Sequence, residues 1–144
     1  MMQKVKKQKG FTLLEVMVVL VIIGLLIAIV APNVLDNQDQ AMKQKAMADI
    51  ASLEQALEMY RLDNFNYPTT EQGLDALVSK PSLAPEPRNY RENGYIRRLP
   101  TDPWGNQYQY RQPGEHGRVD IYSLGADGRP GGEGMNAEIG NWQL

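Results

Sequence analysis

The C-terminal part of the sequence combines oxygen-bearing side chains with glycines, a combination that suits hard metal ions. The segment SLGADGRPGGEGMNAEIGNW carries five glycines between residues 125 and 134, together with Asp127, Glu133, Asn136 and Glu138. Calcium takes roughly six to eight oxygens from carboxylates, amides and backbone carbonyls, and glycines let a loop turn its carbonyls inward. The segment does not follow the EF-hand pattern D-x-[DN]-x-[DN]-G, so its composition leaves open both a calcium loop and an irregular acidic loop.

Residues suited to covalent catalysis are few, and we expect no enzyme. The single histidine, His116, lies in a predicted surface turn, PGEHGR, and the chain has no cysteine to act as a thiol nucleophile. Ser123, His116 and Asp120 lie too close on one predicted hairpin to form a positioned triad with an oxyanion hole. The sequence also lacks the G-x-x-x-x-G-K-[ST] phosphate loop. A membrane-tethered hydrolase is therefore the least supported function.

One carboxylate, Glu15, stands inside a long apolar run. Residues 11–31 are interrupted mainly by Thr12, Glu15 and Gly24. As a helix, this run would span about 31 Å, the thickness of a bilayer's hydrocarbon core. A charge costs about 2.5–3.5 kcal/mol at the bilayer centre and less near an interface. We therefore expect Glu15 to have a partner, the alternative being a side chain that snorkels to the interface.

The charges that flank the apolar run predict its orientation. Four lysines precede it, and none follows soon after Ala31, which places the N-terminus in the cytoplasm and the body across the membrane. A cleaved secretory signal is one alternative, but the run exceeds the usual 7–15 apolar residues, and the small-residue exit at 28–31 would leave Pro32 after the cut. A plain anchor is another alternative, and it leaves Glu15 and the Gly10–Phe11 junction unexplained.

The charge balance of the body argues against nucleic-acid binding as a function. The formal charge is −2, and without the four lysines of residues 1–10 the chain has 11 basic against 17 acidic residues. An acidic body lacks the broad basic surface that nucleic acids require, so we expect no nucleic-acid partner.

The stretch KGFTLLEVMVVLVIIGLLIAIVAPN resembles the class III signal of type IV pilins and type II secretion pseudopilins, with Gly10, Phe11 and Glu15 at the characteristic positions. The resemblance implies that a prepilin peptidase cleaves between Gly10 and Phe11 on the cytoplasmic face and methylates the new N-terminus. The apolar segment would be retained as an assembly helix.

Cleavage at this junction would create a partner for the acid. Glu15 of one subunit can meet the Phe11 ammonium of another, and because an unpaired buried charge is costly, the pair would set the register of assembly. Gly24 and Pro32 weaken the helical hydrogen bonding. They mark either a segment that bends or melts when the subunit leaves the bilayer, or a tolerated kink.

The sequence predicts an α+β fold with a long N-terminal helix and a small antiparallel sheet. We divide it into a leader 1–10, a transmembrane and polymerisation helix 11–32, and a periplasmic domain 33–144. That domain comprises an amphipathic helix 33–62, a connecting αβ-loop 63–103, and a sheet with the C-terminal loop over 104–144. The helical spacing predicts an inward stripe of Met42, Ala46, Ile50, Leu53, Leu57 and Tyr60.

Shorter elements follow in the body. A helix over 71–79, capped by Thr70, is predicted from the pattern of its leucines. Strands are expected over 107–111 and 119–124, with an edge strand or packed tail over 138–144. Asp102 and Trp104 are expected to organise the turn before the first strand.

Four blocks, YPTTEQGLDALV, GYIRRLPTDPWGNQYQY, DIYSLGADG and IGNW, narrow the resemblance. They resemble the major pseudopilins of type II secretion, the general secretion pathway protein G family, across essentially the whole chain. The resemblance implies a type IV pilin-like fold and a calcium ion in the C-terminal loop. It would use the carbonyls of Leu124 and Arg129 and the side chain of Asp127. Glu133 and Asn136 are further candidate ligands, and Glu138 is the alternative if one of them does not bind.

The function that this resemblance implies is structural. The chain would be an inner-membrane subunit that polymerises with itself into a periplasmic fibre and drives the export of folded proteins. Implied partners are minor pseudopilins, the prepilin peptidase, an inner-membrane assembly platform and its ATPase. The alternative is a major type IV pilin of surface fibres, although type IV pilins more often carry a C-terminal cysteine pair, which is missing here.

Overall fold

The computed structural model describes residues 7–144, apart from the side chain of residue 33, and the chain divides into two units, Met1–Gln38 and Asp39–Leu144. The predicted leader 1–10 is therefore described only from Lys7 onward, and its first six residues lie outside the described residues.

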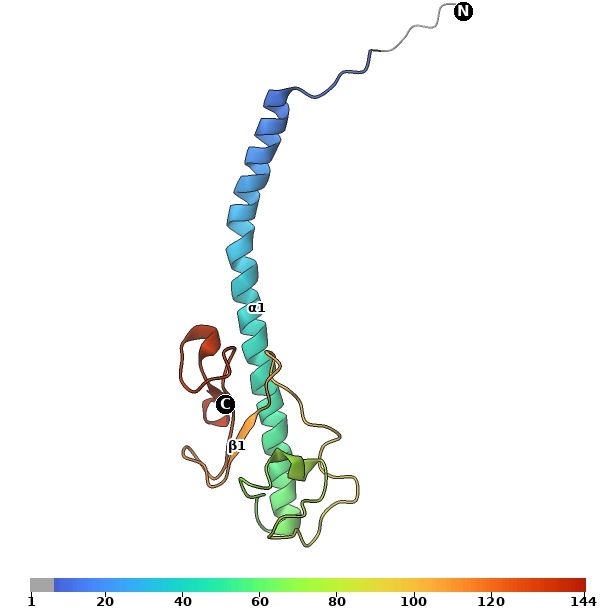
Figure 1. Cartoon of the computed structure of the whole chain (residues 1–144), viewed down its shortest axis with the longest axis vertical. Helices are drawn as coiled ribbons and strands as arrows, with labels where there is room; N and C mark the ends of the chain where they lie inside the picture. The colour runs from blue at the N-terminus through green and yellow to red at the C-terminus, as the bar shows by residue number, and fades with distance from the viewer. Residues whose placement is uncertain (1–6) are drawn as a thin grey trace, which may run out of the picture. The chain divides into compact units, whose positions relative to one another are not determined.

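The principal element is α1 (Leu13–Asn64), shown in Figure 1. Its start is set by Thr12, whose Oγ1 accepts a hydrogen bond from the Glu15 backbone N–H at 3.2 Å and whose carbonyl accepts one from Val16. This is one half of a Thr-x-x-Glu capping box. Both Gly24 and Pro32 lie within the helix, which is assigned without a break at either residue.

The helix was expected to end near Leu62–Asn66, and it ends within that range. It closes at Asn64, where the Phe65 N–H donates to the Arg61 carbonyl at 2.7 Å and Phe65 adopts a positive φ of 68°. The Asn64 side chain is buried and donates to the Tyr60 carbonyl and the Tyr95 hydroxyl. These hydrogen bonds satisfy groups that the last turn of a helix leaves free.

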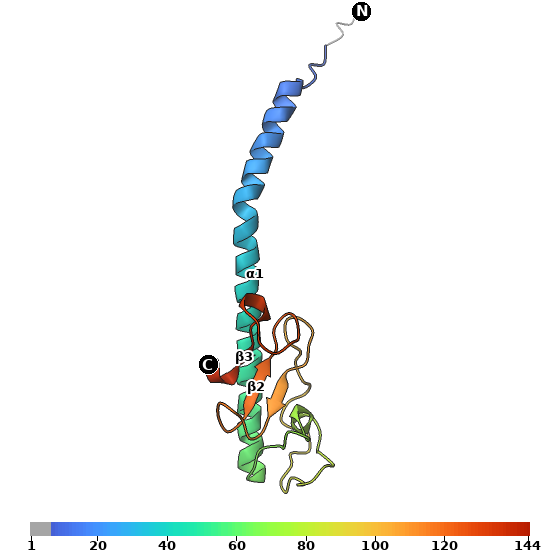
Figure 2. The same ribbon diagram turned by 60° about the vertical axis from the view of Figure 1, so that its left-hand side comes forward.

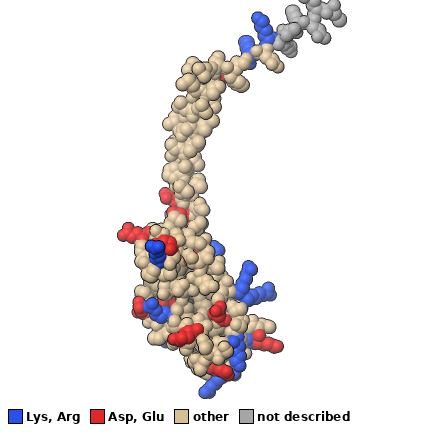
Figure 3. Space-filling view, in the orientation of Figure 1, with Lys and Arg blue, Asp and Glu red and all other residues tan. Residues whose placement is uncertain are grey.

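In the first unit, every described side chain is exposed. Between Glu15 and Asp36 there is no charged residue, and the face drawn in Figure 3 shows this stretch without acidic or basic side chains. An 18-residue window in α1 reaches a mean hydropathy of 3.2, so the helix is long and apolar enough to cross a membrane. This composition is consistent with membrane anchoring.

The second unit has a closed apolar core. Residues of α1 supply one side of it, namely Ala46, Ile50, Leu53, Ala56, Leu57 and Tyr60. The predicted stripe is thus confirmed except for Met42, which is only partly buried, while Ala56 was not predicted. The other side consists of Leu74, Ala76, Leu77, Tyr108, Val119, Ile121 and Ile139.

The sheet has three short antiparallel strands in the order β1-β2-β3 (Figure 2). They are β1 (Gln109–Arg111), β2 (Asp120–Ser123) and β3 (Ile139–Gly140), with Tyr110 opposite Ile121 and Ser123 opposite Ile139. Each strand is shorter than the range predicted for it. After β3 the chain forms the 3₁₀ helix η3 (Asn141–Gln143), so the predicted edge strand over 138–144 is only two residues long.

The helix predicted over 71–79 is wrong in type and length. The structure forms the 3₁₀ helix η1 (Leu74–Leu77), and Thr70 does not cap it, because its Oγ1 donates to the Gln112 carbonyl beyond β1. The buried Gln72 instead exchanges hydrogen bonds with Thr69 and donates to the carbonyls of Leu83 and Pro85. Gln72 therefore anchors the proline-rich loop, and Gly73 directly after it has a positive φ of 65°, which an α-helix over 71–79 could not contain.

Candidate functional site

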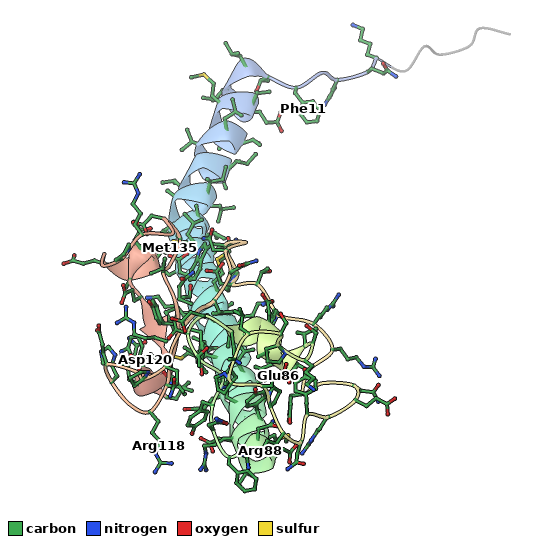
Figure 4. The ribbon with its side chains drawn as sticks, turned by 60° about the horizontal axis from the view of Figure 1, so that its bottom comes forward. Phe11, Glu86, Arg88, Arg118, Asp120 and Met135 are labelled. Carbon is green, nitrogen blue, oxygen red and sulfur yellow. The ribbon has the colours of Figure 1, made fainter. Side chains whose placement is uncertain are left out.

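The predicted processing junction lies ahead of α1 in an extended segment. Gly10 and Phe11 precede the first helical residue, and the Phe11 side chain is 85% exposed (Figure 4). A Cβ at position 10 would meet no heavy atom within 4 Å. Since this unit does not itself require glycine there, a requirement for Gly10 would have to come from another molecule.

Glu15 lies in the first turn of α1, where the helix dipole favours a negative side chain. Within the described residues its carboxylate forms no salt bridge, so none of these residues is the partner expected from the sequence. Thr12 is the residue of this segment whose role was missed. Its signal was present, because threonine followed three residues later by glutamate before an apolar run marks a helix start.

The candidate metal ligands lie on one loop between β2 and β3, which also contains the 3₁₀ helix η2 (Gly134–Asn136). Met135 of η2 is labelled in Figure 4. The two arms of the loop are joined by a hydrogen bond from the Ala126 N–H to the Met135 carbonyl at 2.9 Å. Asp127 Oδ1 accepts from the Arg129 N–H, and Glu138 Oε1 accepts from the Gly131 N–H, each at 3.1 Å.

Two glycines allow this close approach of the arms. Gly125 and Gly132 both have positive φ. A Cβ on Gly125 would lie 2.7 Å from the Asn136 carbonyl carbon, and one on Gly132 would lie 2.5 Å from the Asn136 carbonyl oxygen. Both contacts are with backbone, so a larger residue would force the arms apart. Packing therefore requires glycine at these two positions, whereas a Cβ on Gly131 or Gly134 would meet no heavy atom of the described residues within 4 Å.

The donor chemistry of the loop suits a mixed carbonyl and carboxylate site. Among the described residues, no three His, Cys, Asp or Glu side chains lie close enough together to hold a metal ion. The predicted set is not of that kind, because it relies on the carbonyls of Leu124 and Arg129 and on Asn136 as well as on the carboxylates of Asp127 and Glu133. Hard cations accept such oxygens on flexible loops. The structure thus brings the predicted residues onto one loop without forming a cluster of carboxylates.

Asp102 is placed beside this loop by the turn that precedes β1. Its side chain is 3% exposed, and Oδ1 accepts from the N–H groups of Trp104 and Asn106 at 3.1 and 2.8 Å. The prediction that Asp102 organises this turn is confirmed. Its second oxygen, Oδ2, accepts from the buried Ser123 hydroxyl at 2.8 Å, a contact that the sequence did not predict.

The histidine side chain is held on the other side of β2. His116 Nδ1 lies 3.2 Å from Asp120 Oδ2, and its ring stacks on Trp142 at 3.9 Å between centroids. Burial opposes ionisation of Asp120, but hydrogen bonds from the Glu115 N–H and from His116 outweigh it and lower the pKa of this carboxyl. Ser123 pairs with Asp102, and His116 pairs with Asp120. The three residues therefore do not form a triad, as expected.

Comparison with known proteins identifies the relatives of this chain. Residues 33–142 match the family model "Type II secretion system (T2SS), protein G", and residues 5–31 match the "Prokaryotic N-terminal methylation motif". The chain is 63% identical to type II secretion system core protein G of Vibrio cholerae serotype O1, over 99% of this chain and 97% of the relative. It is 60% identical to the corresponding protein of Aeromonas hydrophila, with the same coverage.

A solved structure supports the same relationship. The major pseudopilin from the type 2 secretion system of enterohaemorrhagic Escherichia coli matches with a TM-score of 0.71 and 59% identity, covering 78% of this chain and 96% of that one. This match confirms the expected α+β fold, with a long N-terminal helix and a small antiparallel sheet. The chain therefore belongs to the type II secretion system protein G family.

Proposed function

We propose that this chain, after removal of the leader at Gly10–Phe11, polymerises into the periplasmic pseudopilus of a type II secretion system and drives export of folded proteins. The observation that carries the proposal is the contrast between its two units. One closes its own apolar core, whereas the other exposes every described side chain of a helix without charges between Glu15 and Asp36. Such a helix needs lipid or sister helices around it.

The membrane position follows from the same segment. The helix is first held in the inner membrane, with its lysine-bearing end in the cytoplasm and the second unit in the periplasm. Assembly transfers the helix from lipid to a bundle of identical helices. The chain supplies structure and no catalysis. Cleavage, N-methylation and energy come from a prepilin peptidase and from an assembly platform with its ATPase, and minor pseudopilins complete the fibre.

The C-terminal loop would bind calcium in a structural role. Leu124 and Arg129 would contribute carbonyl oxygens, and Asp127, Glu133 and Asn136 would contribute side chains. The ion would offset the repulsion between carboxylates and replace hydrogen bonds to water that the loop otherwise needs. Because calcium binds only the folded loop, it stabilises the domain. This stabilisation grows with the logarithm of the calcium concentration once that concentration exceeds the dissociation constant.

Complementation of a deletion strain tests the proposed function. Wild type and Asp127→Ala are expressed in a strain that lacks this chain, and secretion of an exoprotein is measured in the medium, with cell-surface fibre motility as a second readout. We expect wild type to restore secretion and Asp127→Ala not to restore it. Motility should be the same in the deletion strain and in both complemented strains. Restored motility without restored secretion would instead support a surface pilin.

A further inference from the structure

We propose that Asp102 is a positioning residue for the calcium loop, acting through Ser123 and Asn106 on the arm that carries Leu124, Asp127 and Arg129. The inference rests on the proposed calcium site and assigns a role to residues outside the loop. It begins from the buried hydrogen bond between Ser123 and Asp102, which joins the turn before β1 to the last residue of β2.

The start of this arm is fixed through Ser123. Its hydroxyl is fully buried, donates to Asp102 Oδ2 at 2.8 Å and accepts from the Gly125 N–H at 3.1 Å. Gly125 has a φ of 83° and directly follows Leu124, whose carbonyl belongs to the peptide bond that this N–H completes. Because a peptide unit is planar, fixing the Gly125 N–H also fixes the direction of the Leu124 carbonyl.

Further along the same arm, the Asn106 side chain borders Gly128. The Asn106 backbone is held by Asp102, since its N–H donates to Asp102 Oδ1 at 2.8 Å and its carbonyl accepts from the Asp102 N–H at 2.8 Å. A Cβ added to Gly128 would be 3.5 Å from Asn106 Nδ2. Gly128 stands between Asp127 and Arg129, the two other ligands expected on this part of the loop. One buried carboxylate thus orients the Leu124 carbonyl through Ser123 and holds the residue that borders Gly128.

This arrangement gives Asp102 a function that a simple turn would not need. A turn at 102–106 is complete with the two N–H groups that Oδ1 accepts, whereas Oδ2 is used only for Ser123 among the hydrogen bonds of the described residues. A flexible loop must otherwise order its oxygens when the ion binds, and that ordering weakens affinity. Holding this arm in place before binding removes part of this cost.

The test is calcium titration of the full-length protein in detergent micelles by isothermal calorimetry, with thermal unfolding measured in chelator. Four variants are compared with wild type: Ser123→Ala, Asn106→Ala, the ligand variant Asp127→Ala and the control Gln72→Ala. Gln72 is buried and holds four hydrogen bonds far along the chain from the loop, so its loss destabilises the same domain without touching the site.

We expect Ser123→Ala and Asn106→Ala each to raise the calcium dissociation constant about fivefold, as the loss of one hydrogen bond or close contact implies. Asp127→Ala should raise it much further, and Gln72→Ala should lower the unfolding temperature in chelator with an unchanged dissociation constant. Hydrogen exchange of the calcium-free protein should show faster exchange at Gly125 in Ser123→Ala.

The outcomes separate the two proposals. If wild type takes up no calcium, the calcium site itself is refuted and the role of Asp102 falls with it. If wild type binds and Ser123→Ala binds equally well, the positioning role is refuted while the site stands. Weakening by Gln72→Ala to the same degree would also refute it, because affinity would then follow domain stability.

Discussion

The substitution Glu15→Gln tests the role of the Glu15 charge, because it removes the charge and keeps the shape of the side chain. Within the chain, this carboxylate lies in the first turn of α1 and has no salt bridge among the described residues. Its local contribution is the interaction with the helix dipole, about 0.3–1 kcal/mol, and glutamine retains the capping-box pattern with Thr12. A local role therefore predicts a small effect on assembly.

An intersubunit role predicts a much larger effect. Removing one partner of a buried ion pair costs about 3–5 kcal/mol, because the remaining charge, here the Phe11 ammonium, is left unpaired. At 1.4 kcal/mol per tenfold change, this weakens each subunit contact by about two to three and a half orders of magnitude. Fibres should then disappear, although the helix and the folded domain remain.

The assay compares wild type, Glu15→Gln and the surface control Glu71→Gln. Fibres are sheared from cells that overproduce the chain and measured by sedimentation and immunoblotting, and N-terminal sequencing verifies that each chain begins at Phe11. Normal fibre yield from processed Glu15→Gln would falsify the register hypothesis and leave only the local role. Loss of fibres in Glu71→Gln would show that the assay does not report this contact.

Three further predictions concern the second unit. Leu57→Ala, at a fully buried position, should lower the free energy of unfolding by about 2–5 kcal/mol. Leu62 is 67% exposed on the same helix, so Leu62→Ala should change this free energy by less than about 0.5 kcal/mol. Thermal melts in micelles measure both effects. Because its folded-state pKa is lowered, Asp120 contributes stability that is present above about pH 4 and is lost as the pH falls through the lower folded value. Melts between pH 2 and 6 should therefore show a smaller acid-induced decrease in Asp120→Asn than in wild type. Gly125→Ala should lower the unfolding temperature and abolish the stabilisation by calcium, because its Cβ would lie 2.7 Å from the Asn136 backbone. If calcium raised the unfolding temperature of this variant as much as that of wild type, the close packing of the arms would be contradicted.

The sequence was most informative where one physical term dominates. The apolar run was predicted because apolar residues follow one another over a bilayer-spanning length, and the stripe of α1 because burial repeats with the helix period over many residues. The sheet was predicted only in outline, because strands of two to four residues carry too few alternating positions to mark their ends. The helix predicted near Leu74 failed because the Gln72 and Thr70 side chains bind distant carbonyls, which no local pattern records.

The residues of the candidate site also differ in how far the sequence alone predicts their roles. Gly10, Phe11 and Glu15 lie within a few residues of one another, and Thr12 completes a signal that is readable from the sequence. In the C-terminal loop, composition indicates which oxygens are available but not what orders them. The buried contact that we assign to this task joins residues separated by 21 positions, and neither serine nor aspartate is unusual at its place in the sequence. A flexible ion-binding loop gains from such support, because the scaffold then carries an ordering cost that the ligands would otherwise meet alone. Removing the Ser123 hydroxyl, which makes two hydrogen bonds, should therefore weaken calcium binding, whereas Gln72→Ala, which destabilises the same domain away from the loop, should leave the calcium affinity unchanged.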